Sequence, residues 1–142
     1  VDHEETSRLV RNAAFIASVR NYDCGAPIKN TARFPHLYYW NAVGLTDHFG
    51  RPSPVGMRVD ISSVIETKTE MLAAHASQRR WLSHLNKVDE YLDMMRRQSQ
   101  AEGRHIKAAY AEGFNQFRGF GHPQDNILKK LLGSLCRETR RG

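Results

Sequence analysis

Apolar residues recur at helical spacing in several segments of this 142-residue chain. The segments are 4–19, 63–78, 88–103 and 127–135. The first has an apolar face wide enough to predict a well buried helix. In the second, Ser63 and Glu66 have the spacing of a capping box, in which each side chain bonds a free backbone N–H at the start of the helix.

Shorter segments have the aromatic and β-branched content of strands, at about 36–43, 58–62 and 108–114. Proline, glycine and other turn formers fill much of the chain between them. Because helices alternate with short strands, the pattern predicts a layered α/β fold. No repeat, low-complexity tract or linker divides the sequence, so we expect one domain over residues 1–142.

Polar side chains fall on the apolar face of the second predicted helix. A helix turns by about 100° per residue, which places Lys68 and His75 about 40° and about 20° from Val64. Burying an unpaired ammonium costs too much free energy to be accidental. Lys68 is therefore expected to meet a carboxylate inside the protein, with His75 as a hydrogen-bonded core residue, or else both side chains line a cavity. Gln78 falls on the same face, and Glu112 is either the buried partner of a cation or a solvent-facing strand residue.

The composition is globular, with 40% hydrophobic residues, 25% charged residues and a net charge of +6. Basic residues gather after Lys129, and we expect a solvated basic tail at about 136–142. That tail has no aromatic residue for base stacking, so nucleic-acid binding is not favoured. No apolar window reaches the length of about 18 residues that a membrane span needs, and Cys24 and Cys136 lack the spacing of a zinc site, which together favour a cytoplasmic protein with reduced thiols.

Other residues have two readings each. The aromatic run at 38–40 is expected in the core, with a substrate wall as the alternative. His122 and Asp125 are expected in a turn and a helix cap. Arg33 and His36 lie on the long loop before the first strand, where binding residues often sit, with an exposed structural loop as the alternative. The sequence has no HExxH, GxSxG, GxGxxG or Walker motif that would define a site by itself.

Three segments carry more specific motifs: DHEETSRLV at 2–10, VDISSVIETKTEMLAAHASQ at 59–78 and YAEGFNQFRGFGHPQDNIL at 110–128. Together they resemble the LmbE/PIG-L family of zinc-dependent N-deacetylases, which act largely on N-acetylated sugars. The resemblance covers nearly the whole chain in the same order. It implies a partial, helix-rich Rossmann-like α/β fold with a few short strands and a metal site at the carboxyl edge of the sheet.

The resemblance also implies roles for individual residues. Asp2 and His3 match the end of an H-x-D-H segment, so His3 would be a zinc ligand and Asp2 a catalytic-site group beside it. His75 would line the substrate side of the site, and Lys68 would form a structural ion pair. The HPDD segment that supplies the remaining ligands and the general base in this family does not occur in the sequence.

We therefore expect the C-terminal part of a metal-dependent deacetylase, inactive alone, with Zn²⁺ in the complete enzyme and little or none held by this part. Uncovered strand edges would make the chain a homo-oligomer. Two alternatives stay open: a non-catalytic assembly module of the same lineage, and a less favoured basic nucleic-acid-binding domain. No membrane partner is expected.

Overall fold

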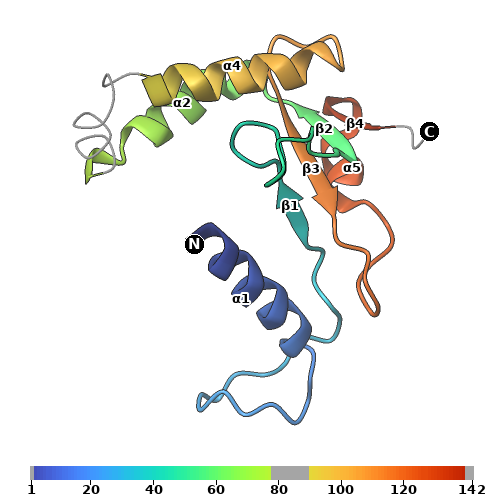
Figure 1. Cartoon of the computed structure of the whole chain (residues 1–142). Helices are drawn as coiled ribbons and strands as arrows, with labels where there is room; N and C mark the ends of the chain where they lie inside the picture. The colour runs from blue at the N-terminus through green and yellow to red at the C-terminus, as the bar shows by residue number, and fades with distance from the viewer. Residues whose placement is uncertain (1, 78–89, 140–142) are drawn as a thin grey trace. The chain divides into compact units, whose positions relative to one another are not determined.

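The computed structural model describes residues 2–77 and 90–139 (Figure 1). Its helices are α1 (Asp2–Ile16), α2 (Ile65–Ala73), α4 (Glu90–Arg104) and α5 (Ile127–Leu132), with the 3-10 helices η1 (Ser62–Val64) and η2 (Gly133–Leu135). Its strands are β1 (Tyr38–Trp40), β2 (Met57–Asp60), β3 (Ala111–Gln116) and β4 (Cys136–Glu138). The predicted mixture of helices and strands is confirmed. None of the helices in these two ranges is long and apolar enough to cross a bilayer.

The described strands form one sheet in the order β1-β3-β2-β4 (Figure 1). Strand β2 is antiparallel to both neighbours, with Met57 opposite Phe114 of β3 and Val59 opposite Cys136 of β4. Strand β4 occupies the start of the predicted basic tail at 136–142. Its pairing with β2 and the complete burial of Cys136 tie this part of the tail to the sheet.

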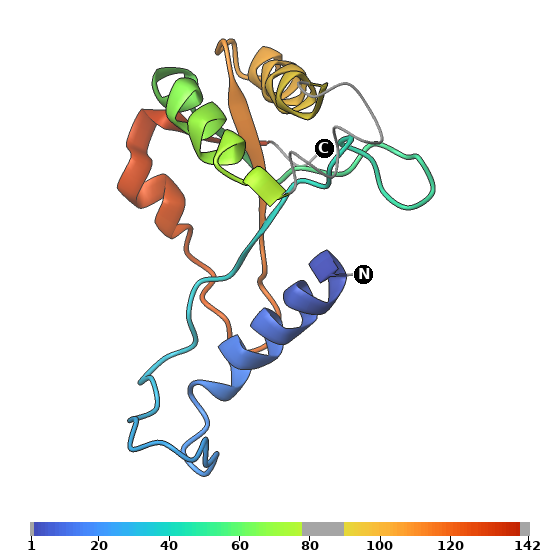
Figure 2. The same ribbon diagram turned by 90° about the vertical axis from the view of Figure 1, so that its left-hand side faces the viewer.

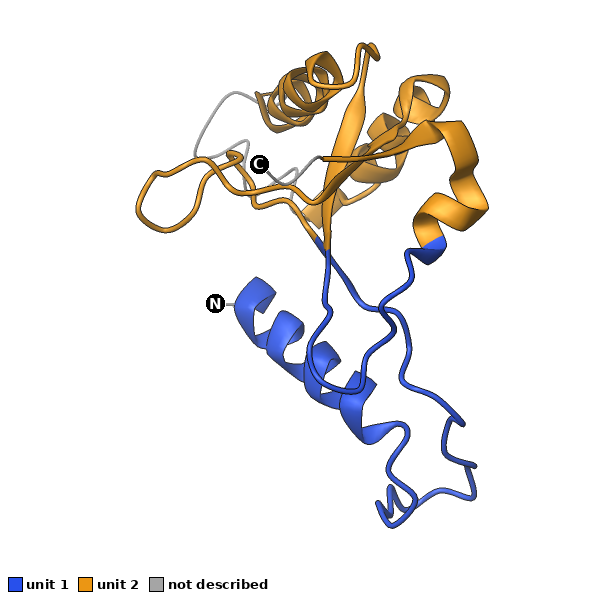
Figure 3. Ribbon diagram, turned by 90° about the vertical axis from the view of Figure 1, so that its right-hand side faces the viewer, with its two compact units in different colours: residues 1–39, 116–127 blue, residues 40–115, 128–142 orange. Residues whose placement is uncertain are grey.

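The chain divides into two compact units (Figure 3). Unit 1 comprises residues 1–39 and 116–127, and unit 2 comprises residues 40–115 and 128–142. Within unit 2, α2 and α4 lie side by side next to strand β3 (Figure 2). The Tyr91 hydroxyl of α4 donates a hydrogen bond to the Leu72 carbonyl of α2 over 3.5 Å, which links the two helices.

The core of unit 2 is built around strand β2 and the start of α2. Its buried apolar residues are Met57, Val59, Ile61, Ile65, Ile106, Ala111 and Cys136. Met57 and Val59 alternate along β2 and therefore share one face of the sheet. The end of α4 is equally close-packed, since a Cβ added at Gly103 would lie 2.6 Å from the Ala108 carbonyl oxygen.

The start of α2 differs from the predicted capping box. The helix follows η1, its N-cap is Val64, and no side chain caps it. Glu66 instead accepts two hydrogen bonds from Arg96 of α4, over 2.8 and 2.9 Å. The capping prediction is wrong because a bidentate, charge-assisted contact is stronger than the backbone bond that Glu66 would otherwise make.

The prediction that the first helix is well buried is also wrong. Ala14 is the buried residue of α1, whereas Leu9 is 58% exposed and Val10 and Phe15 are each 48% exposed. Much of the rest of unit 1 is loop between 17 and 37 and after 116. Loops cannot cover a wide helix face as a sheet or a second helix would.

Candidate functional site

The centre of unit 2 holds an ion pair between α2 and β3. The Lys68 ammonium lies 2.7 Å from the Glu112 carboxylate, and the two side chains are only 21% and 17% exposed. Lys68 also donates a hydrogen bond to the Ser99 hydroxyl of α4 over 3.2 Å. The helical phase of Lys68 thus turns it inward, as predicted. Its partner is the half-buried carboxylate of Glu112, which the sequence had suggested as the partner of a cation.

Trp40 of β1 covers the same ammonium. The Lys68 Nζ atom lies 5.2 Å from the centre of the indole ring, within the range of a cation–π contact. The indole also stacks on Phe114, with ring centres 6.3 Å apart. Trp40 nevertheless stays 60% exposed, so the prediction of a core aromatic strand is wrong for this residue. Strand β1 is at the end of the described strand order, and no further strand there covers the indole.

Asn41, the residue after β1, is anomalous. Its backbone N–H donates a hydrogen bond to the Gly113 carbonyl over 3.0 Å, which continues the pairing of β1 with β3. Its side-chain amide nitrogen and oxygen are both buried without a hydrogen-bond partner in the described residues. Gly113 makes room for this amide, since a Cβ there would lie 2.7 Å from the Asn41 nitrogen. An unsatisfied buried amide costs about 1–3 kcal/mol, so burying Asn41 at this strand end lowers the free energy of unfolding of the protein.

Two further cations of unit 2 are engaged in structural pairs. Arg58 of β2 lies 2.7 Å from Glu102 of α4, and both side chains are nearly buried. Arg96 binds Glu66 and also donates to the Tyr110 hydroxyl over 3.3 Å. The hydrogen bond from Arg96 holds the pKa of Glu66 below its ordinary value of 4.5. The first pair connects α4 to the sheet and the second connects α4 to α2, so both have structural roles apart from the Lys68–Glu112 pair.

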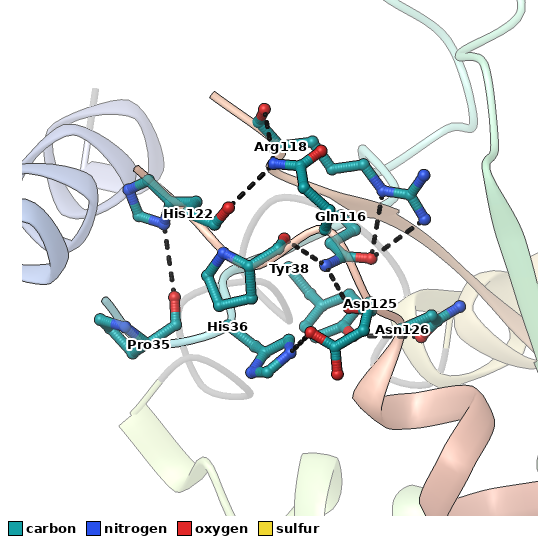
Figure 4. A network of polar contacts seen from close by, with 10 residues as sticks. Pro35, His36, Tyr38, Gln116, Arg118, His122, Asp125 and Asn126 are labelled. Carbon is teal, nitrogen blue, oxygen red and sulfur yellow. Dashed lines mark hydrogen bonds and ion pairs between the residues drawn. The ribbon is translucent and has the colours of Figure 1, made fainter. Parts of the chain in front are cut away.

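Unit 1 has a separate polar network (Figure 4). The His36 Nε2 atom lies 3.0 Å from the Asp125 carboxylate, and the Tyr38 hydroxyl donates to the Asn126 side chain over 3.1 Å. Gln116 joins the same network by donating to the Asp125 carbonyl over 2.7 Å. The predicted loop position of His36 is confirmed, and Asp125 orients its imidazole.

The residues that the resemblance assigned to the site lie on two different units. Asp2 and His3 are exposed in the first turn of α1, in unit 1. His75 is exposed and lies beyond the end of α2, in unit 2. The predicted helical phase of His75 is wrong because α2 ends at Ala73, and Gln78 lies outside the described residues.

The fit of these residues to zinc is incomplete. Within 2–77 and 90–139, no group of three His, Cys, Asp or Glu side chains could hold a metal ion. Catalytic zinc generally takes three protein ligands, so Asp2 and His3 do not by themselves meet its requirement. Comparison of the chain with protein-family models, with curated proteins and with solved structures found no match. A proposal of function therefore depends on the residues and contacts of this chain.

Proposed function

We propose that the chain is part of a metal-dependent hydrolase of the LmbE/PIG-L kind, which removes acetyl groups from N-acetylated sugars or related conjugates. The observation that carries the proposal is the Lys68–Glu112 ion pair. It joins two of the resembling segments, because Lys68 belongs to VDISSVIETKTEMLAAHASQ, the most specific of them, and Glu112 belongs to YAEGFNQFRGFGHPQDNIL. Strand β3 and the last two residues of β2 belong to the same two segments, and the two strands are direct neighbours.

In this proposal the chain supplies the scaffold on the substrate side of the site. His3 would be one zinc ligand with Asp2 beside it, and His75 would line the cavity for the acyl sugar. The other ligands would come from a segment of the HPDD type, which this sequence lacks, so the chain would be inactive alone. The parallel strands of a Rossmann-like layer would likewise be additional to β2 and its two antiparallel neighbours. The reduced state of Cys24 and Cys136 fits a cytoplasmic enzyme.

The test is to express the coding region together with whatever precedes Val1. We expect an in-frame HPDD segment, stoichiometric zinc by mass spectrometry, and acetate release from N-acetylglucosamine derivatives. His3→Ala should remove both zinc and activity, whereas His105→Ala, which changes another exposed histidine, should leave both intact. A preceding sequence without such a segment, or a His3→Ala protein that keeps its zinc, would refute the proposal.

A non-catalytic assembly module is the second candidate, and the exposed apolar residues of α1 favour it. Leu9, Val10 and Phe15 present apolar surface that a binding partner could cover. In this case the full-length protein would hold no zinc and release no acetate. The same two measurements therefore separate the two functions.

A further inference from the structure

Unit 1 contains a small cavity that the proposed hydrolase function does not use. Its volume is about 220 Å³. The lining residues are Arg11, Asn12 and Phe15 of α1, and Phe117, Phe120 and His122 of the loop after β3. The cavity is open to solvent, because Phe120 is 97% exposed and Arg11 and Asn12 are exposed as well. It combines three aromatic side chains with one cation, one amide and one imidazole.

Glycines allow the loop backbone to approach two aromatic rings closely, and one of these rings, that of Phe117, lines the cavity. A Cβ at Gly119 would lie 2.5 Å from the ring of Phe117, and one at Gly121 would lie 2.8 Å from the ring of Phe34. Gly121 also has a φ of +82°, which disfavours any other residue. Phe34 in turn packs against the imidazole of His122, with ring centres 5.2 Å apart. A side chain at either glycine would therefore collide with a ring.

His122 has a defined tautomer. The side chain is 5% exposed, and its Nδ1 atom lies 3.3 Å from the Pro35 carbonyl oxygen (Figure 4). A carbonyl oxygen only accepts hydrogen bonds, so Nδ1 carries the proton and donates it. In the neutral ring the other nitrogen, Nε2, then keeps its lone pair. His122 lines the cavity, and because Nδ1 is engaged by Pro35, Nε2 is the ring nitrogen left for a ligand.

Arg11 gives the cavity a positive charge. It forms no ion pair with any residue of the described ranges, unlike Arg8 one turn earlier, which pairs with Glu5 over 2.7 Å. A guanidinium presents parallel N–H donors that match a carboxylate, and the neighbouring Asn12 amide can donate to the same group.

We propose that this cavity binds a small aromatic carboxylate that carries a hydroxyl group. The ring of the ligand would pack on the phenylalanines, whose edges and faces favour aromatic partners. Its carboxylate would bind Arg11, and its hydroxyl would donate to the lone pair of His122 Nε2. The binding site lies wholly within unit 1, so the proposal does not depend on hydrolase activity.

The test is a titration of the ¹⁵N-labelled 142-residue chain with 3- and 4-hydroxybenzoate, followed by amide chemical shifts. We expect saturable shifts for at least one isomer, confined to α1 and residues 117–122. Arg11→Gln should weaken binding about tenfold or more, because a hydrogen bond to a charged group is lost. Arg118→Gln removes an equal charge from the loop that supplies the other lining residues, at a position that does not line the cavity, and should change the affinity less than about twofold.

Two analogues check the individual contacts. Cyclohexanecarboxylate lacks the aromatic ring, and benzoate lacks the hydroxyl donor; both should bind more weakly than the better hydroxybenzoate. The proposal is overturned if neither hydroxybenzoate gives saturable shifts, if Arg11→Gln and Arg118→Gln bind alike, or if cyclohexanecarboxylate binds as tightly as the aromatic acids. Dispersed spectra of both arginine variants would establish that each remains folded.

Discussion

Lys68 and Glu112 meet over 2.7 Å and hold helix α2 against strand β3. Both side chains keep about a fifth of their surface in water, and Ser99 and Trp40 supply their other contacts. The pair is therefore shielded enough that neither charge is well solvated without the other.

Replacement of Lys68 by Met should lower the free energy of unfolding by about 1–3 kcal/mol, because Glu112 is left without its cation in a poorly hydrated place. Urea unfolding measures this loss. In the double variant Lys68→Met/Glu112→Gln the loss should be smaller than the sum of the single losses. Arg8→Ala, which breaks an exposed pair, should cost no more than about 1 kcal/mol, and an equal effect at Lys68 would contradict the shielding.

Gly103→Ala should destabilise the protein by about 1–3 kcal/mol, although alanine normally favours a helix by about 1 kcal/mol over glycine. The new Cβ would lie 2.6 Å from the Ala108 carbonyl oxygen and 3.0 Å from the Tyr110 nitrogen, and both atoms are backbone. Arg97→Ala on the exposed side of α4 is the control and should change stability by less than about 0.5 kcal/mol. A stabilised Gly103→Ala protein would show that α4 and the next segment are less closely packed than described.

The stability of the Glu66–Arg96 contact should depend on pH in a defined direction. Arg96 lowers the pKa of Glu66 in the folded protein below its ordinary value of 4.5. The contact therefore stabilises the folded protein above pH 4.5, and this stabilisation is lost as the pH falls through the lower pKa that Glu66 has in the folded protein. Glu66→Gln should thus be less stable than the parent at pH 7, and the difference should shrink below about pH 4.5. Urea unfolding across this range, with Glu70→Gln from the same helix as control, measures the effect; a difference that grows on acidification would reverse the assigned sign.

The two cysteines should react with Ellman's reagent at very different rates. Cys24 is exposed, whereas Cys136 has no exposed surface and burial raises the pKa of its thiol. Since the thiolate is the reacting form, Cys136 should be labelled only when β4 opens or the protein unfolds. Cys24→Ser should abolish the fast phase and Cys136→Ser the slow one. Equal rates for both thiols in the native protein would contradict the pairing of β4.

We expect the chain to self-associate through strand β1. Among the described strands β1 and β4 end the sheet, and β4 carries the charges of Arg137 and Glu138, which discourage pairing with another chain. The exposed edge residue of β1 is Trp40, so Trp40→Lys should shift sedimentation velocity profiles toward the monomer. A parent protein that sediments as a monomer at all concentrations would contradict this expectation.

The sequence predicted those features that depend on local periodicity. The inward phase of Lys68 follows from helical spacing alone, and the elements around it appear within a few residues of their expected bounds. The partner of Glu66 could not be found in this way, because Arg96 belongs to a helix that only the folded chain brings alongside. No glycine or proline marks the end of α2 before His75. The periodic pattern therefore predicts a helix that continues through His75, beyond the point where α2 ends.

The contacts within unit 1 also could not be predicted from local sequence patterns. His36 and Asp125 are widely separated in sequence, and no sequence motif indicates that they make contact. The burial of His122 depends on two phenylalanine rings, one of them contributed by the loop before β1. The glycines at 119 and 121 were the available signal, since close approach of a backbone to a ring demands residues without a Cβ.

The strand order has a consequence for protein synthesis. Every neighbouring pair in the described sheet includes β3 or β4, so β1 and β2 emerge from the ribosome before either has a partner. The nascent chain must keep YYW and MRVD from pairing elsewhere until Ala111–Gln116 has been translated. Sheet assembly thus waits until β3 and β4 have been translated, and chaperones that shield extended segments would have their greatest effect before that point.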